Sequence, residues 1–412
     1  MDNHNSILML LYLVVIGLSA STIHSQITKK PTNPHDFNII DSCWRKNVNW
    51  ANTRQSLANC AIGFGHGAIG GQNGQIYIVH DTSDDPINPN PGTLRYGATR
   101  AEPLWITFAK DMIITLKNEL LVNSHKTIDG RGAKIEIAHG PCITMERVHN
   151  VIIHGLIIHD CRPGTPSLVR DRPDHMMHIN GHDGDGIAVI QSFNVWIDRC
   201  HFASCGDGLI DVIHGSTNIT ISNSYFNDHK KVMLLGHSDS YAPDKAMKVT
   251  LVLNHFGPRL RERIPRVRYG YAHVVNNMYE PWENYAIGGS SDSTILSESN
   301  YFHASNEHKE VTKRETNEDW KKWKWMSVSD VFINGAFFRP SGLSNDVPRP
   351  SYSHIQQFKV AEGTLVPSLT SNAGALHCVP GAFALNFLKY QIPAPIPNAP
   401  ATETAVKVPG KS

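Results

Sequence analysis

The chain has 412 residues, of which 41% are hydrophobic and 18% are charged. Such a chain can bury a large core, and its length normally implies two or three domains unless the fold grows by repetition. The formal net charge of +1 excludes a general electrostatic attraction to nucleic acid or to an anionic membrane, so any anion must be bound locally.

The first predicted element is an apolar run from Ile7 to Ala20, which is too short to span a bilayer comfortably. Small and polar residues follow it, although no Lys or Arg precedes it. The pattern predicts a signal peptide over residues 1–25, with cleavage after Ser21 or Ser25; a buried helix is the alternative. We therefore expect a secreted protein without a membrane segment in its mature form.

Residues 38–66 are predicted to form an N-terminal cap with one amphipathic helix, because Trp44, Trp50 and Leu57 recur with apolar spacing. The chain contains seven cysteines and no C-x-x-C pair, which disfavours a zinc or redox site. In an oxidising compartment we expect the bridges Cys43–Cys60 and Cys142–Cys161, with at least one free thiol. Asn218 begins an acceptor pattern for glycosylation, within an apparent strand.

Six segments share one pattern, which is a short strand of alternating apolar residues, a polar turn and a large apolar residue. They are NVIIHGLII (150–158), NVWIDRCHF (194–202), NITISNSYF (218–226), KVTLVLNHF (248–256), YAHVVNNMY (271–279) and STILSESNY (293–301). Their starts lie 44, 24, 30, 23 and 22 residues apart, so the unit is 22 to 24 residues with two loops inserted. Residues 126–134 and 105–116 are predicted to supply two earlier units.

Short strands at this period, without helices between them, predict an all-β fold: a right-handed parallel β-helix with an N-terminal capping helix and peripheral loops. A β-sandwich and a leucine-rich repeat are the alternatives, but no L-x-x-L-x-L pattern occurs, and sandwich strands recur at shorter spacing.

We expect one domain over 26–390, with the cap at 38–66, the coils at 100–305 and a C-terminal packing segment at 306–390. Within that segment, residues 325–338 are predicted to lie back along the helix. The remaining 391–412 is rich in Pro and Ala and is predicted to be a disordered tail.

The stretch from Gly181 to Asp211 is unusually acidic, and Arg199 is its single Lys or Arg residue. Its carboxylates are Asp183, Asp185, Asp198, Asp207 and Asp211. Carboxylates that the fold brings together raise one another's pKa unless a cation neutralises them, and ligation by oxygen alone favours calcium. Three of these residues precede Gly, however, and Asp-Gly pairs also favour tight turns.

The period of the repeat distinguishes a metal site from a series of Asp-Gly turns. Asp185 and Asp207 are 22 residues apart, Asp207 and Lys231 are 24 apart, and Asp211 follows Asp207 by four. Residues one period apart lie on adjacent coils about 4.8 Å apart, so these side chains and the run 261–268 are predicted to form one column. Carboxylates that hold a metal beside Lys and Arg would suit a polyanionic substrate, although Arg259, Arg261 and Arg266 also fit a solvated surface.

The chain resembles plant pectate lyases of polysaccharide lyase family 1, close to the pollen pectate-lyase-like allergens. The matching segments include DSCWR (41–45), GTLRYGATR (92–100), KTIDGRGAK (126–134), HDGDGI (182–187), DGLIDV (207–212), KVMLLGHSDSY (231–241), RIPRVRYGY (263–271) and YAIGGS (285–290). The resemblance implies a secreted, monomeric cell-wall enzyme. Its expected reaction is Ca²⁺-dependent β-elimination of polygalacturonate, or de-esterified pectin, which leaves 4,5-unsaturated galacturonosyl ends.

Roles for individual residues follow from the same resemblance. Arg263 matches the catalytic base, and Lys231 and Arg268 match residues that bind the substrate carboxylate. The implied calcium ligands are Asp185, Asp207 and Asp211, with Asp183 as an accessory carboxylate.

The chain departs from the family pattern at Arg199 and His214, which would alter the charge of the site, and at Gly186, Val267 and Tyr269. The main alternative function is a pectin-binding wall protein or allergen of the same fold with weak or no lyase activity. A polygalacturonase would use paired Asp residues without calcium, and a pectin lyase usually lacks the calcium aspartates, so both are disfavoured.

Overall fold

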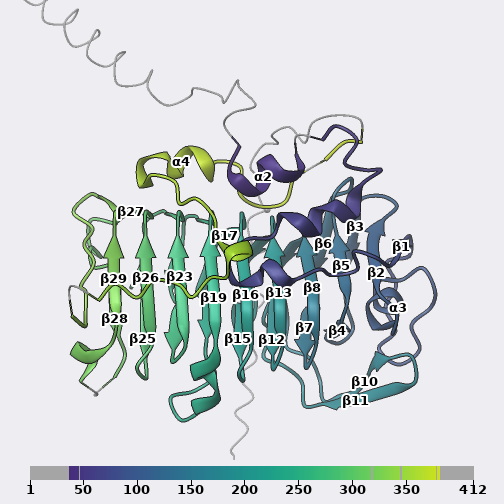
Figure 1. Cartoon of the computed structure of the whole chain (residues 1–412). Helices are drawn as coiled ribbons and strands as arrows, with labels where there is room; N and C mark the ends of the chain where they lie inside the picture. Colours follow the sequence, from purple (N-terminus) through teal and green to yellow (C-terminus); the bar gives the residue numbers. More distant parts are fainter. Residues whose placement is uncertain (1–36, 46, 317–318, 344–345, 377, 381–412) are drawn as a thin grey trace, which may run out of the picture.

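The computed structural model describes residues 37–45, 47–316, 319–343, 346–376 and 378–380. The predicted signal peptide and the predicted tail lie outside the described residues. Three long parallel sheets run the length of the molecule, and successive strands enter the three sheets in turn (Figure 1). This arrangement is the parallel β-helix that the period predicted.

The strands of each sheet follow the helix axis. The first sheet consists of β1 (Gln75–Val79), β2 (Leu104–Phe108), β5 (Lys126–Asp129), β8 (His149–His154), β13 (Phe193–Asp198), β16 (Thr217–Ser222), β19 (Lys248–Val252), β23 (Tyr271–Val275), β26 (Thr294–Glu298) and β29 (Trp325–Val328). The second consists of β3 (Met112–Ile114), β6 (Ile135–Ala138), β9 (Ile157–His159), β14 (His201–Ala203), β17 (Tyr225–Asn227), β20 (His255–Phe256), β24 (Met278–Tyr279), β27 (Tyr301–His303) and β30 (Val331–Ile333). The third consists of β4 (Leu120–Leu121), β7 (Ile143–Glu146), β12 (Ile187–Ile190), β15 (Gly208–Ile213), β18 (His229–Leu235), β22 (Arg266–Arg268), β25 (Ile287–Ser290) and β28 (Thr312–Arg314), with β21 (Leu260–Glu262) also paired to β18.

The six sequence repeats each form one strand of the first sheet and one of the second. In the first five repeats the large apolar residue that closes the repeat lies in the interior; in the sixth, Phe302 takes this place instead of Tyr301, because the register is shifted by one residue. Ring centroids of Phe202 and Phe226 lie 5.2 Å apart, and those of Phe226 and Phe256 lie 5.1 Å apart. Asn277 accepts from the backbone N–H of Asn254 at 2.9 Å, one rung of a buried asparagine ladder. These ladders fix the vertical register of the coils.

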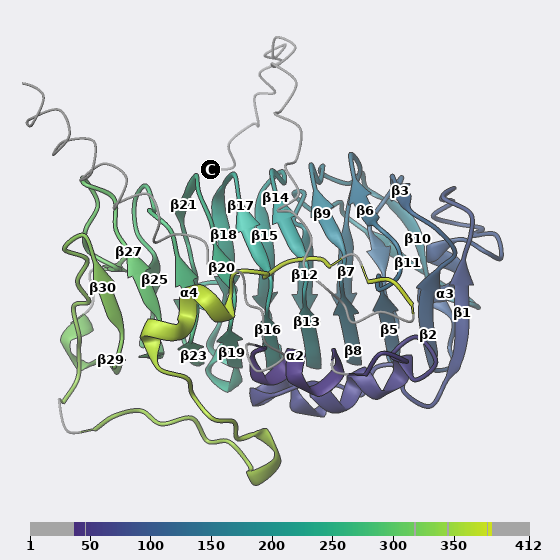
Figure 2. The same ribbon diagram turned by 90° about the horizontal axis from the view of Figure 1, so that it is seen from above.

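The coils extend further than the predicted 100–305, because strands run from Gln75 to Ile333. The prediction that residues 325–338 lie back along the helix is wrong: they contain β29 and β30, which form a further coil. Later residues take that path instead (Figure 2). The hydroxyls of Tyr352 and Thr250 share a hydrogen bond. The backbone oxygens of Ala361 and Asn372 accept hydrogen bonds from the side chains of Asn276 and Arg199, respectively.

The cap is also different from the single helix that we expected. It contains α2 (Ile39–Trp44) and the 3₁₀ segments η2 (Arg54–Cys60) and η3 (Gly63–Gly67). The glycines of η3 let the backbone approach the first sheet closely: a Cβ on Gly65 would lie 2.6 Å from the backbone nitrogen of Thr220. Trp44, Trp50 and Leu57 pack with Trp196 on the outer face of this sheet, as Figure 2 shows for the cap as a whole.

Both predicted disulfides, Cys43–Cys60 and Cys142–Cys161, are present, and the other three cysteines are free thiols. Asn218 lies in β16 and is half-buried. Among the described residues, no helix is both long and apolar enough to cross a membrane. The remaining elements are α3 (Leu94–Thr99), the antiparallel hairpin β10 (Ser167–Arg172) and β11 (His175–Ile179), η4 (Ala242–Ala246), η5 (Trp320–Lys322), η6 (His354–Gln356), η7 (Gly363–Leu365) and α4 (Val366–Leu369).

The third sheet carries polar side chains on its outer face. Its inner positions, such as Ile210 and Val212, belong to the main core. Residues between them face outward by strand alternation. The pairing register aligns five of these outward positions from β15 onwards: Asp211, Leu234, Arg266, Gly288 and Lys313.

Candidate active site

Four carboxylates from two successive coils meet at the edge of the third sheet. Asp183 and Asp185 precede β12, Asp207 immediately precedes β15, and Asp211 is the fourth residue of β15. Carboxylate oxygens of Asp183, Asp185 and Asp207 all lie within 4.8 Å of one another. Gly208 is the first residue of β15, and a Cβ there would be 2.7 Å from Asp211 Oδ1 and 2.9 Å from Asp185 Oδ1. The absence of a side chain therefore leaves room for two carboxylates to converge.

The predicted column is wrong by one residue in its register, because Gly208 and not Asp207 is level with Asp185 and Lys231. Ile187 pairs with Ile210, and Gly208 pairs with Lys231, so the local repeat is 23 residues. Asp185 is therefore level with Gly208, whose N–H donates to Asp185 Oδ1 at 2.6 Å, and Asp207 lies one position earlier. Asp207 nevertheless reaches the column through its side chain, which accepts a hydrogen bond from the Lys231 ammonium.

The clustered charges change the acidity of the buried members. Burial, and then the charges of Asp183 and Asp207, raise the pKa of Asp185 to about 7. Burial, and then the charges of Asp185, Asp207 and Asp183, raise the pKa of Asp211 well above its usual value, although the Arg263 charge opposes this. Lys231 is the cation that the chain itself places against this cluster.

Arg263 differs from the other arginines of its run because those others are paired with acids. Four such pairs are present: Arg259 with Asp228, Arg261 with Glu262 at 3.8 Å, Arg266 with Glu315 at 2.5 Å and Arg268 with Asp239 at 3.2 Å. Among the described residues, Arg263 has no ion-pair partner, and its buried Nε has no hydrogen-bond partner. Its guanidinium therefore lies beside the acidic cluster with donors to spare.

Arg268 lies at the opposite edge of the same sheet face, at the end of β22. It donates to the backbone oxygen of His237 at 2.8 Å and to that of Gly236 at 3.3 Å. Burial, and then the Arg266 charge, lower the pKa of Arg268. These contacts hold its guanidinium in one orientation over the sheet.

Three residues that we expected at or near the acidic cluster lie elsewhere. Asp198 is on the first sheet, where it accepts from Ser222 at 2.6 Å, and Arg199 is paired with Asp41 under the cap. Arg199 therefore does not change the charge of the site, contrary to our expectation. His214 follows β15 at its far end and stacks on His237 with ring centroids 3.8 Å apart, away from the carboxylates.

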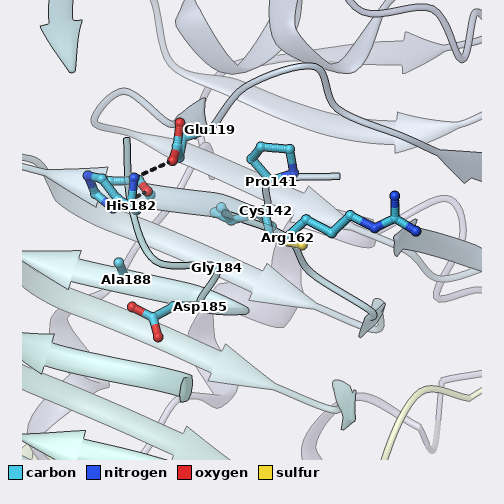
Figure 3. Close-up of a pocket in the computed structure, with 10 residues that line it drawn as sticks. Glu119, Pro141, Cys142, Arg162, His182, Gly184, Asp185 and Ala188 are labelled. Carbon is cyan, nitrogen blue, oxygen red and sulfur yellow. Dashed lines mark hydrogen bonds between the residues drawn. The ribbon is translucent and has the colours of Figure 1, made fainter. Parts of the chain in front are cut away.

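A small pocket continues the site towards the N-terminal coils (Figure 3). Asp185 lines it together with Thr144, His182 and Glu119. Glu119 is buried and accepts from the backbone N–H of His182 at 2.7 Å, while its other oxygen has no partner in the described part of the chain. Sequence reasoning missed Glu119, which has no pattern around it that distinguishes it from a surface acid.

The donor set fits a hard divalent cation. The cluster offers carboxylate oxygens and no sulfur or imidazole ligand, which is the ligand set preferred by calcium. Burial, and then the neighbouring carboxylates, raise the pKa of Asp185 to about 7, so a cation at this place would stabilise the charged form. The Lys231 ammonium already lies on one side of the cluster, where it neutralises part of the negative charge of the carboxylates.

Comparisons with known proteins agree with this geometry. A family model described as pectate lyase matches residues 111–375. A pectate lyase from Zinnia elegans is 53% identical over 350 residues, which cover 84% of this chain and 86% of that protein. A protein from Arabidopsis thaliana that carries a pectate lyase name is 60% identical over 344 residues, or 83% and 87% of the two chains.

The same similarity holds for solved structures. The crystal structure of Jun a 1, the major allergen from cedar pollen, has a TM-score of 0.80 and 50% identity, and the match covers 82% of this chain and 99% of that one. A pectate lyase from Bacillus sp. N165 in complex with trigalacturonate has a TM-score of 0.52 and 22% identity, covering 78% and 99%. The second match shows the fold alone.

Proposed function

The chain belongs to the pectate lyase family, and on that premise we propose that it is a Ca²⁺-dependent pectate lyase that cleaves polygalacturonate by β-elimination. One observation carries the proposal: an unpartnered Arg263 lies beside a cluster of four carboxylates and Lys231. Cations and metal-binding carboxylates on one open sheet face suit a substrate that carries a carboxylate on every sugar.

Asp185, Asp207 and Asp211 would hold the metal, with Asp183 as an accessory ligand. Gly208 supports this assignment because its missing side chain lets Asp185 and Asp211 approach one point. A bound Ca²⁺ supplies a Lewis acid that binds the uronate carboxylate and acidifies the adjacent C5 proton.

Lys231 contributes a second positive charge to the same carboxylate. Its ammonium is paired with Asp207 and is 43% exposed, so it can exchange one carboxylate for another without leaving the site. Three donors on this group allow it to contact Asp207 and a substrate oxygen at the same time. Charge that develops on the uronate during proton removal is thereby stabilised.

Arg263 is the base in this scheme. A guanidine nitrogen takes the C5 proton, and the C5–H electron pair forms the C4–C5 double bond. The C4–O bond breaks with its electron pair going to the oxygen, which takes a proton from water as the linked sugar departs. A guanidinium cannot accept a proton, and the neutral guanidine that can is rare at neutral pH because the group holds its proton tightly. The neutral form is favoured by nearby positive charge and by alkaline pH, so we expect activity to increase towards alkaline pH.

Arg268 is proposed to bind a further substrate carboxylate. Its backbone contacts at Gly236 and His237 fix the guanidinium, so less side-chain freedom is lost when an anion binds. We further propose secretion to the cell wall as a monomeric single-domain enzyme. The apolar N-terminal segment and the two disulfides support an extracellular location.

The test is the rise in ultraviolet absorbance of the unsaturated product, measured with polygalacturonate and calcium at alkaline pH. Wild-type protein is expected to give this product, and Asp207→Ala is expected to lose it. Asp228→Ala is the matched control because Asp228 lies on the next coil and pairs with Arg259 outside the cluster. A wild type that gives reducing ends without absorbance would be a hydrolase, and one that gives neither would be a pectin-binding protein.

A further inference from the structure

A second pocket lies on the outer face of the third sheet, towards the C-terminal coils. Its lining includes Asn284, Tyr285, Lys309, Lys313 and Phe337. Lys313 occupies the same outward column as Asp211 and Arg266, with Gly288 between Arg266 and Lys313. Two coil steps separate Lys313 from the coil of Arg263, or about 10 Å at the usual strand spacing. The pocket thus lies in line with the site described above.

Lys313 is held in place without being neutralised. Its ammonium lies 5.4 Å from the centroid of the Tyr285 ring and donates to Asn284 Oδ1 at 3.3 Å. No carboxylate pairs with it among the described residues. Asn284 is itself oriented by Glu262, which accepts from its amide and lies opposite Lys231 in the ladder. The ammonium therefore has a fixed position and at least one donor to spare.

Tyr285 forms the floor beneath Lys313. A Cβ on Gly288 would lie 2.2 Å from Tyr285 Cε2, so this glycine is what allows the ring to lie flat on the sheet. Tyr285 is 1% exposed, and its hydroxyl has no hydrogen-bond partner in the described part of the chain. The buried ring therefore supports the Lys313 ammonium from below.

The remaining lining matches a sugar acid rather than a simple ion. Phe337 is 44% exposed at the same pocket and offers an apolar surface to a pyranose ring. The acid Glu310 is paired with Arg339 at 3.1 Å, and Lys309 donates to the backbone oxygen of Asn334 at 2.6 Å. Glu307 is exposed at the rim. Lys313 is left as the cation that faces the opening.

We propose that Lys313, with Tyr285, Asn284 and Phe337, forms a distal subsite that binds the carboxylate and ring of a galacturonate unit remote from the scissile bond. This inference rests on the proposed function, and it assigns to the pocket a preference for long galacturonan chains. A long chain that passes Arg263 along the sheet face reaches Lys313 two coils later, whereas a trimer does so only when two of its sugars lie on that side of Arg263.

The test compares Lys313→Gln with the wild type on polygalacturonate and on trigalacturonate, both with calcium. Loss of one exposed charge-assisted contact is expected to raise KM for polygalacturonate about threefold to tenfold, with kcat unchanged. The rise in KM should be smaller for trigalacturonate, and Lys313→Arg should restore most of the affinity. Lys322→Gln is the matched control, because Lys322 is an exposed lysine of η5 paired with Asp319 at 3.4 Å.

Equal KM values of Lys313→Gln and wild type on polygalacturonate would overturn the subsite. So would an equal rise in Lys322→Gln, which would indicate a general effect of surface charge. If the wild type forms no unsaturated product, the proposed function fails separately. Calorimetric titration of the same variants with polygalacturonate then tests the subsite by affinity alone, and equal affinities would overturn it.

Discussion

Two groups of aspartates lie on different faces of the β-helix, and they differ in which cations neutralise their charge. Under the cap, Asp129 accepts from Arg131 at 2.8 Å and from Arg54 at 3.0 Å, and Asp41 is paired with Arg45 at 2.8 Å. On the third sheet, four carboxylates share the single ammonium of Lys231 and the nearby charge of Arg263. In the first group every carboxylate is paired with arginine, whereas in the second group the carboxylates outnumber the cations beside them.

The acidity of the two groups differs in direction. Burial alone would raise the pKa of Asp129, but the charges and hydrogen bonds of Arg131, with the charge of Arg54, hold it well below its usual range. Burial and neighbouring carboxylates raise the pKa of Asp185 to about 7. The same residue type therefore stabilises the fold on one face and stores repulsion on the other. A fold retains such repulsion where a cation or substrate relieves it.

The largest expected effect concerns Arg263, the arginine beside the carboxylates of the third sheet. Arg263→Lys keeps the charge beside Asp211, but a shorter ammonium cannot place a neutral nitrogen against the C5 proton. We expect turnover to fall by about three orders of magnitude while KM changes little. The measurement is the absorbance assay, with Arg261→Lys as a control from the same run. If Arg263→Lys is as active as the wild type, the base must instead be Lys231 or Arg268.

The next effect concerns the cap. Asp129→Asn leaves Arg54 and Arg131 without their charged partner, which is expected to cost about 3 to 5 kcal/mol in the free energy of unfolding. Denaturant titration measures this loss, and the calcium affinity should not change. Asp228→Asn serves as the surface control, because Asp228 pairs with the exposed Arg259. If Asp129→Asn is as stable as Asp228→Asn, the ion pairs of Asp129 do not stabilise the fold.

An effect of similar size concerns pH in the absence of calcium. Because the pKa of Asp185 is raised in the folded state, the fold retains a proton that the unfolded chain has lost. The stabilisation is therefore complete below about pH 4 and is lost as pH rises towards 7. The free energy of unfolding falls by about 1.4 kcal/mol for each pH unit between the unfolded and the folded pKa of this carboxyl.

Thermal melting of chelated protein across this range measures the loss. Asp129 acts in the opposite direction, since its contribution is lost only on acidification below about pH 4. Saturating calcium should remove the decline between pH 4 and 7. An identical decline with and without calcium would argue against a metal at these carboxylates.

The sequence was sufficient for the fold because the 22- to 24-residue period appears in the strands themselves, and the closing Phe and Tyr residues mark each coil. The exact pairing of residues between neighbouring coils could not be predicted from the sequence. Spacings of 22 and 24 around Asp207 average to the 23-residue ladder, and turn lengths decide which residue lies level with Lys231. Side chains bridge such a difference of one residue, so the predicted cluster still assembled.

Other features failed for identifiable reasons. Asp198 and Arg199 belong to the acidic stretch in sequence, but the strand that ends at Asp198 lies in the first sheet, and sequence alone does not say which sheet a coil position enters. Lys313 was missed because the period fades after Tyr301 into charged residues. Aligning Gly288 with a position one coil later would have placed Lys313 in the column.

The most direct test of the contrast between the two faces is calorimetric titration of calcium into wild type, Asp211→Asn and Asp129→Asn. The account predicts one site in the wild type, affinity weakened by about 100-fold in Asp211→Asn, and unchanged affinity in Asp129→Asn. Equal affinity of Asp211→Asn and wild type, or no binding by the wild type, would contradict it and leave Lys231 as the cation that completes the cluster.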